Sequence, residues 1–265
     1  MFTKSSKIIW IIIMKHKNWN ETIKNNFSHA AANYSDYSNI QIYFAKKIAS
    51  YLKEQNIQKG EWIDLGSGTG LLADEIEKKY PAKKVSRIDF SKKMLLQNKE
   101  SSKKILWDLN VGFPPSIRNC TLMTSNFCIH WLDNPEVIIK DWFSKLKSGG
   151  YLIISYPTIN SFKEWKQTCK ETNIKYSGLT FPLPKDIFKS FNSDEIYFSN
   201  KYIYIENFPD IYKLLRSMVN VGAQSTKCKA KTIYELKKLQ KFWPKNEDNS
   251  VNLTWEINIQ ILKKS

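Results

Sequence analysis

The sequence predicts an α/β fold in which a mostly parallel sheet carries helices on both faces. Three observations support this prediction. Strand-like and helix-like segments alternate between residues 60 and 156, the order expected of parallel strands joined by crossover helices. A glycine-rich turn joins the first of these strands to its helix, and apolar and polar residues alternate over residues 251–261 near the end of the chain. With 265 residues, of which 42% are hydrophobic, the chain can bury the core of one such domain.

The first half of the chain supplies the alternating elements. Ile40, Phe44, Ile48 and Leu52 are four residues apart, which predicts an amphipathic helix over residues 40–52. Later boundaries coincide with prolines, glycines or a serine cap. In chain order we expect a strand at 62–65, a helix at 71–80 before Pro81, a strand at 85–90, a helix capped by Ser91, strands at 105–107 and 121–126, a helix at 135–146 ended by Gly149 and Gly150, and a strand at 151–156.

Beyond Pro157 the alternation stops, and a helical insert that could serve as a lid is expected at about residues 158–195. Ser161 with Glu164, and Thr232 with Glu235, have the spacing of capping boxes and so predict the starts of two helices. The remaining expected elements are a loop at 177–184, a strand at 196–205, a helix at 209–219 and a strand at 251–261. We expect the last strand to be half-buried, antiparallel to 196–205 and at or near a sheet edge.

Residues 1–25 are predicted to be an extension of a single domain that spans residues 26–265. The apolar run from Ile8 to Met14 has seven residues, whereas a membrane-spanning helix needs about 20. No small-residue cleavage site follows the run, so neither a secretory signal nor membrane association is expected. We expect residues 1–13 to be poorly ordered.

Cysteine usage and charge restrict the partners. The four cysteines form no C-x-x-C pair and no metal-like spacing with the three histidines, which favours a reduced cytoplasmic protein without a metal, and we expect a monomer. The net charge is +16, but nearly all of it is lysine, whereas phosphate-binding surfaces favour arginine. We therefore expect no nucleic-acid partner, although a basic face would steer an acidic protein.

The glycine turn distinguishes between two kinds of cofactor. Gly66, Gly68 and Gly70 follow the pattern G-x-G-x-G, whereas dinucleotide sites expect G-x-G-x-x-G. Asp64 ends the preceding strand, and its charge would repel a pyrophosphate but attract an ammonium group. S-adenosyl-L-methionine has an ammonium group, a ribose diol and no phosphate, so the sequence favours it.

Two further acids follow neighbouring strands. Asp89 ends the second strand, where a carboxylate can accept hydrogen bonds from both ribose hydroxyls, and Asp108 follows the third strand, where it can accept from the adenine amino group. A single acid at a strand end is as often an ordinary cap or turn residue as it is a ligand-binding residue. Because the carboxyl ends of parallel strands meet at one edge of a sheet, we expect all three acids to surround one ligand.

Segments along most of the chain carry a family resemblance. WIDLGSGTG, RIDFSKKML, SNFCIHWL and LKSGGYLIIS resemble class I S-adenosylmethionine-dependent methyltransferases. From about Asn26 to the C-terminus, other segments resemble the malonyl-acyl-carrier-protein O-methyltransferases of biotin synthesis (the BioC family): NFSHAAANYSDYSNIQ, LPKDIFKSF, FPDIYKLLRSMVNVGA, LKKLQKFWP and LTWEINIQI. The chain departs from that family at His29, usually arginine or lysine, and at His130, commonly glutamine.

The resemblance implies a Rossmann-like fold with a mostly parallel seven-stranded sheet and an antiparallel C-terminal strand. It implies S-adenosyl-L-methionine as the cofactor, with Gln41 near its methionine end. The cofactor-binding residues expected in this sequence are Gln41, Asp64, Gly66, Ser67, Gly68, Gly70, Asp89, Phe90, Asp108, Leu109 and Asn126.

The resemblance also implies an acceptor, the free carboxylate of a malonyl thioester on acyl carrier protein, whose methylation starts the synthesis of a pimeloyl precursor of biotin. Such a carboxyl ionises at roughly pH 3–4, so no general base is needed at neutral pH. Tyr34 and His130 are candidate hydrogen-bond donors to the acceptor, and Trp131 is a candidate pocket wall. Because acyl carrier proteins are acidic, four basic residues are candidates for docking one: Lys185, Lys189, Lys213 and Arg216.

Other functions stay open at this point. A carboxyl methyltransferase of the trans-aconitate type would share the cofactor loop and differ in the acceptor. An RNA-binding protein or RNA methyltransferase would use the basic surface and bind RNA in a steeply salt-dependent way, but the sequence contains no recognisable RNA-binding module. A non-catalytic assembly factor on this fold is disfavoured because all three acids and all three glycines are present.

Overall fold

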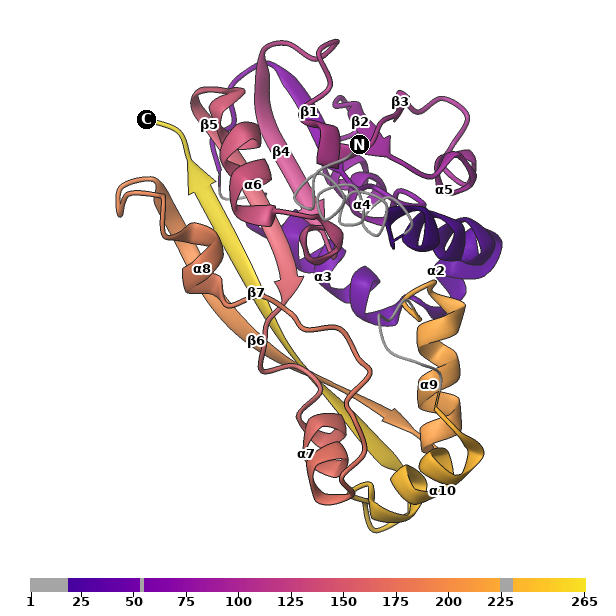
Figure 1. The fold of residues 1–265 in the computed structure, drawn as a ribbon. Helices are drawn as coiled ribbons and strands as arrows, with labels where there is room; N and C mark the ends of the chain where they lie inside the picture. The colour runs from indigo at the N-terminus through magenta and orange to yellow at the C-terminus, as the bar shows by residue number, and fades with distance from the viewer. Residues whose placement is uncertain (1–18, 53–54, 225–230) are drawn as a thin grey trace, which may run out of the picture.

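A seven-stranded sheet forms the centre of the computed structural model, which describes residues 19–52, 55–224 and 231–265 (Figure 1). The strands are β1 (Glu61–Leu65), β2 (Val85–Asp89), β3 (Lys104–Leu106), β4 (Cys120–Asn126), β5 (Leu146–Pro157), β6 (Ile196–Phe208) and β7 (Val251–Lys263). Their order across the sheet is β3-β2-β1-β4-β5-β7-β6. The first five pair in parallel, and β7 is antiparallel to β5 and β6, so the predicted sheet is confirmed.

Helices cover both faces of the sheet (Figure 1). One face packs against α3 (Asn39–Leu52), α4 (Leu71–Lys79), α7 (Lys163–Glu171), α9 (Ile211–Asn220) and α10 (Ile233–Phe242), and the other against α6 (Pro135–Ser144) and α8 (Pro184–Phe188). Residues 19–30 are helical, and the short elements are η1 (Ala31–Asn33), α2 (Tyr34–Tyr37), α5 (Lys92–Leu96), η2 (Leu109–Val111) and η3 (Ile129–Trp131). The poor order predicted for residues 1–13 lies outside the described residues.

The centre of the sheet explains where a ligand can bind. β1 is buried on both sides: Trp62 packs in one hydrophobic core, and Ile63 and Leu65 pack in the other. α4 connects β1 to β2 across one face, whereas α6 connects β4 to β5 across the opposite face. The connections therefore diverge between β1 and β4, and a crevice forms outside the carboxyl ends of these strands.

The helix predicted from Ser161 and Glu164 forms, but without a capping box. Phe162 is the N-cap residue of α7, and no side chain caps the helix there. Ser161 Oγ instead bonds to the backbone of Glu256, and the Glu164 carboxylate accepts from the backbone N–H of Thr254 at 2.9 Å. The capping prediction was wrong because both side chains are used to hold α7 against β7.

Two other predicted caps are confirmed. Ser91 Oγ accepts a hydrogen bond from the backbone N–H of Met94 at 3.3 Å, at the start of α5. Thr232 and Glu235 form a reciprocal capping box at the start of α10. These caps involve only neighbours in sequence, which is why the local pattern was sufficient to predict them.

β5 begins earlier than predicted. α6 ends at Ser144 and β5 starts at Leu146, so Gly149 and Gly150 lie inside the strand rather than at the end of a helix. The Gly149 N–H donates to the carbonyl of Lys264 at 2.7 Å, and the Gly150 carbonyl accepts from the N–H of Lys264. The pairing register with β4 also shifts near this end. The two glycines therefore lie in an irregular part of a strand. The sequence alone does not distinguish this position from the end of a helix.

β7 is buried on both faces, whereas a half-buried strand was predicted. Its polar face carries Asn258 and Gln260, which are only 1% and 3% exposed. Asn258 Nδ2 donates to the hydroxyl of Tyr156 at 3.1 Å, and Tyr156 packs against Phe188 of α8. The predicted antiparallel pairing with residues 196–205 is confirmed, and β6 occupies the edge position. The hydrogen bond to Tyr156 compensates the burial of Asn258, whereas Gln260 Nε2 is buried without a partner among the described residues.

Candidate active site

The glycine turn between β1 and α4 is shaped by two close approaches. Gly66 has a φ of +70°, and a Cβ at this position would lie 2.2 Å from Cys128 Sγ. Gly70 has a φ of +90°, and a Cβ there would lie 2.1 Å from Asn98 Oδ1. Nothing lies within 4 Å of a Cβ built at Gly68. The outer glycines therefore fit the turn against its neighbours, and the middle one faces open space.

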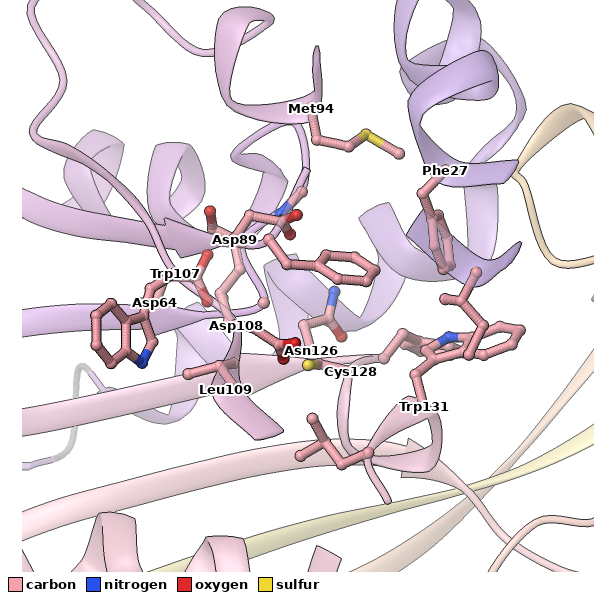
Figure 2. Close-up of a pocket in the computed structure, with 18 of the residues that line it drawn as sticks. Phe27, Asp64, Asp89, Met94, Trp107, Asp108, Leu109, Asn126, Cys128 and Trp131 are labelled. Carbon is pink, nitrogen blue, oxygen red and sulfur yellow. The ribbon is translucent and has the colours of Figure 1, made fainter. Parts of the chain in front are cut away.

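Three carboxylates stand at the carboxyl ends of β1, β2 and β3, on one side of a cavity (Figure 2). Burial raises the pKa of Asp64 to about 7. Asp89 accepts backbone hydrogen bonds from Gly68 at 2.9 Å and from Ser91 at 2.8 Å, and burial raises its pKa to about 6. Asp108 caps η2. Buried carboxyls with raised pKa values become fully charged when a cationic ligand group binds beside them.

The cavity bounded by these acids has an empty volume of about 880 Å³, counted to its open mouth. Gly70 does not line it, so this glycine acts through the shape of the turn. The other predicted cofactor residues do line it: Gln41, Asp64, Gly66, Ser67, Gly68, Asp89, Phe90, Asp108, Leu109 and Asn126.

Polar atoms in the cavity wall lack partners. Asp64 Oδ2, Gln41 Oε1 and Ser67 Oγ are buried without a hydrogen bond to any described residue. Leaving such atoms unpaired costs about 1–3 kcal/mol each, so they indicate a ligand with several N–H or O–H donors. Asn126 holds Gln41 in place, since its Nδ2 donates to the Gln41 carbonyl at 2.9 Å.

One wall of the cavity comes from the helical residues 19–30, most of which precede the predicted domain start at residue 26. Asn20, Ile23 and Phe27 line the cavity, and Asn20 Nδ2 donates to Asp133 at 3.0 Å. The sequence analysis missed Asn20 and Ile23. Their spacing of three and four residues up to Phe27 is the helical signal that would have found them.

A second chamber, with an empty volume of about 630 Å³, adjoins the first. Its additional walls are mainly apolar, and Phe162 packs edge-on against Trp255 with ring centroids 4.4 Å apart. The two chambers share the lining residues Phe27, Tyr34, Gln41, Phe127 and Trp131. A group bound in one chamber can therefore lie next to a group bound in the other, at the boundary that these side chains form.

The structure brings together the three residues predicted on the acceptor side, because Tyr34, His130 and Trp131 all line the second chamber. Burial lowers the pKa of His130 to about 3, so its imidazole is neutral at physiological pH. Burial also raises the pKa of Tyr34, whose hydroxyl stays protonated and able to donate. Trp131 packs edge-on against Phe27 with ring centroids 5.2 Å apart. His29, in contrast, is exposed and lines neither chamber.

Glu206 of β6 also lines the second chamber and was missed by the sequence analysis. The strand was predicted to end at Ile205, but β6 continues to Phe208. Side chains alternate along a strand, so extending the pattern of Tyr202 and Tyr204 by one step would have placed Glu206 on the same face.

The four basic residues predicted to dock a partner do not form one surface. Lys185 lies on α8 and Lys189 is the C-cap residue that follows it, on the same side of the sheet as α6, and Lys189 Nζ is 3.0 Å from Glu136 Oε2. Lys213 and Arg216 lie on α9, on the opposite side, and α9 lines the second chamber. The sheet therefore separates the two pairs (Figure 1).

The described residues contain neither a metal-binding cluster nor a membrane-spanning helix. Within these ranges no three His, Cys, Asp or Glu side chains are placed to hold a metal ion. No helix among the same residues has the length and apolar character needed to cross a bilayer.

The model of a protein family described as "Methyltransferase domain" matches residues 37–196. The match covers more than half of the chain and includes the glycine turn and all three carboxylates. The chain belongs to this methyltransferase family. The cofactor of the methyltransferase is S-adenosyl-L-methionine, and the cavity fits it, since the unpaired oxygens of Asp64 and Gln41 match an ammonium group.

Two curated relatives of the methyltransferase are named for the same reaction. "Malonyl-[acyl-carrier protein] O-methyltransferase 2" of Coxiella burnetii is 25% identical, over 76% of this chain and 80% of its own length. "Malonyl-[acyl-carrier protein] O-methyltransferase 1" of Ilyobacter polytropus is 24% identical, over 91% of this chain and 94% of its own length.

Solved structures show the same fold at low sequence identity. The YcgJ protein of Bacillus subtilis has a TM-score of 0.57 at 11% identity, covering 84% of this chain and 99% of its own. The plantazolicin methyltransferase BpumL, solved in complex with SAH, has a TM-score of 0.50 at 13% identity, covering 96% of this chain and 100% of its own.

Proposed function

We propose that the methyltransferase transfers a methyl group to the free carboxylate of a malonyl thioester on an acyl carrier protein, at the start of biotin precursor synthesis. The observation that carries the proposal is the agreement of the curated relatives, which span most of this chain and are named for that reaction. The motifs at both ends of the chain, described above, support the same acceptor.

When bound, S-adenosyl-L-methionine supplies a methyl group made electrophilic by its sulfonium centre. In our proposal Asp64 and Gln41 hold the ammonium end through their unpaired oxygens. Asp89, fixed by two backbone N–H groups, accepts from the ribose hydroxyls, and Asp108 accepts from the adenine amino group. Gly66, Ser67 and Gly68 line the same cavity, so the backbone of the glycine turn would contact the cofactor.

The second chamber is the proposed acceptor site. Tyr34 belongs to both chambers, so its hydroxyl can donate to a carboxylate oxygen beside the transferred methyl group. His130, with a pKa of about 3, is too weak a base to deprotonate a phenol or an amine. A carboxylate needs no such base, so the neutral imidazole supports a carboxyl acceptor. The apolar walls would keep water away and hold the acceptor in line with the methyl group.

A carrier protein would approach the second chamber from the side of α9 in this proposal. Lys213 and Arg216 give that side positive charge, which would speed the encounter with an acidic partner. Lys185 and Lys189 lie on the opposite side of the sheet and serve as an internal comparison.

The proposal is tested by incubating the purified protein with methyl-labelled S-adenosyl-L-methionine and malonyl-acyl carrier protein. We expect a labelled ester on the carrier that mild base removes. Malonyl-coenzyme A and free tricarboxylic acids form parallel arms. Preferential labelling of a tricarboxylic acid would replace the malonyl thioester with a trans-aconitate type of acceptor and overturn the proposal.

A further inference from the structure

Among the described residues, those that line the second chamber include one carboxyl group and no lysine or arginine. The ionisable residues among the described residues that line it are Tyr34, Tyr37, His130 and Glu206, and none is lysine or arginine. His130 is neutral there. An ionised Glu206 would repel a carboxylate acceptor in a site where water screens the two charges poorly. The carboxylate acceptor proposed above therefore requires Glu206 to be uncharged when the acceptor binds.

Glu206 is held by one of its two oxygens. Trp255 Nε1 donates to Glu206 Oε2 at 2.8 Å, whereas Oε1 has no hydrogen-bond partner among the described residues. Trp255 is itself fixed, since its ring packs against Phe162 and Phe127 at centroid distances of 4.4 and 6.0 Å. One oxygen of a rigidly placed carboxyl group is thus left for a ligand in the chamber.

We propose that Glu206 binds the acceptor carboxylate as a neutral acid, its proton shared between the two carboxyl groups. The proposal rests on the proposed carboxyl acceptor and identifies the residue that selects for it. A protonated carboxyl is an O–H donor, and a hydrogen bond from it to a carboxylate is short and strong. Burial raises the pKa of Glu206, which favours the protonated form, while the Trp255 hydrogen bond opposes that shift.

The other charged groups that the structure describes around Glu206 do not remove this requirement. Tyr204, on the same strand, is protonated at neutral pH, and the Glu206 charge contributes to its raised pKa. On β7, Glu256 is bonded to Thr158 and lies near Lys201, and none of these three lines the chamber. On α9, the basic residues Lys213 and Arg216 also do not line the chamber.

The proton does not leave Glu206 during methyl transfer. An acceptor carboxylate oxygen forms the new bond to the methyl carbon while the carbon–sulfur bond breaks, and the electron pair stays on sulfur. The carboxylate loses its negative charge and the sulfonium its positive charge, so the products are a neutral ester and a neutral thioether. Glu206 keeps its proton, and its shared hydrogen bond to an anion is lost, which favours release of the ester.

The experiment measures proton uptake when malonyl-coenzyme A binds to the protein saturated with S-adenosylhomocysteine. Calorimetry in two buffers with different ionisation enthalpies gives the number of protons taken up. At a pH where free Glu206 is ionised, we expect the wild type to take up about one proton per acceptor bound and Glu206→Gln to take up none. Glutamine still donates a hydrogen bond, so this variant should bind the acceptor, whereas Glu206→Ala should bind it about tenfold or more weakly.

Glu100→Gln is the matched control, since Glu100 is exposed and lines neither chamber. It should behave as the wild type. Equal proton uptake by wild type and Glu206→Gln, with both folded by melting temperature, would overturn the inference. Failure of the proposed function looks different: the wild type would bind S-adenosylhomocysteine and show neither binding nor methylation of any malonyl thioester.

Discussion

The two chambers of this methyltransferase are built in different ways. The polar side of the cofactor chamber comes from the ends of consecutive strands, so Asp64, Asp89 and Asp108 lie within a short stretch of the chain. The second chamber, which is the proposed acceptor site and is called the acceptor chamber below, combines residues as far apart as Phe27 and Trp255, brought together by β7 and the helices around it. The comparison teaches that the cofactor site follows from a local motif, whereas the acceptor site depends on the folding of the whole chain.

The chambers also differ in charge. The cofactor chamber presents three carboxylates to a ligand that carries positive charge. The described residues of the acceptor chamber present mainly apolar side chains and one carboxyl group to a ligand proposed to carry negative charge. Changes that affect one chamber should therefore leave the other largely unaffected, and the following predictions test that separation.

The largest effect is expected from Asp64→Ala. This change removes the carboxylate proposed to pair with the ammonium group, and truncating one partner of a buried charge pair costs about 2–5 kcal/mol. Affinity for S-adenosylhomocysteine, measured by calorimetry, should fall by about 30-fold to several thousandfold.

Asp194→Ala is the control for this prediction, because Asp194 is exposed and lines neither chamber. It should bind S-adenosylhomocysteine as the wild type does. Wild-type affinity in Asp64→Ala would remove the basis for the cofactor site described here.

Tyr34→Phe should weaken the acceptor side selectively. A lost hydrogen bond to a charged group costs about 1.5–3 kcal/mol, so kcat/KM for the malonyl thioester should fall by about 10- to 150-fold. Affinity for S-adenosylhomocysteine should stay within about twofold, since no polar contact to it is assigned to Tyr34. Tyr37→Phe, in a residue that lines only the second chamber and is 48% exposed, should change kcat/KM little. Equal losses of cofactor and acceptor affinity in Tyr34→Phe would contradict the division into two chambers.

The chambers should respond to pH in opposite directions. Protonation removes the charge of Asp64 and Asp89, whose pKa values are about 7 and 6, so affinity for the ammonium-bearing cofactor should fall as pH decreases through this range. Ionisation of Glu206 adds negative charge to the acceptor chamber, so KM for the malonyl thioester should rise with pH, by at most about tenfold per unit. Titrating S-adenosylhomocysteine affinity and acceptor KM separately across pH 5–9 checks both signs. Parallel trends would show that one set of groups controls both sites.

The sequence was sufficient for the sheet and the cofactor side because both depend on local signals. Strand ends, prolines and the spacing of Gly66 to Gly70 placed the three acids correctly. The errors involve distant contacts. Glu164 resembled a helix cap but bonds to Thr254, and Gly149 resembled a helix end but lies in a strand beside the C-terminal segment.

Glu206 was missed for a related reason. Its place in the acceptor chamber depends on a strand longer than predicted and on its hydrogen bond to Trp255, a residue almost fifty positions away. The alternation of Tyr202 and Tyr204 gives the face of the strand on which Glu206 lies, but it does not indicate that this face lines a chamber. The acceptor side of this fold therefore has to be determined from the structure.

The smallest effect is expected at the protein surface, where the two faces of the sheet provide their own comparison. Charge reversal at Lys213 and Arg216 should raise KM for malonyl-acyl carrier protein by roughly 3- to 10-fold at low salt, because exposed charges mainly change the rate of encounter. The effect should diminish at high salt, and malonyl-coenzyme A should be affected less because it has no protein surface to align. Reversal at Lys185 and Lys189, on the opposite side of the sheet, supplies the same change in net charge and should have little effect. If both double variants raise KM equally, the positive charge acts as a general field rather than as a docking surface on α9.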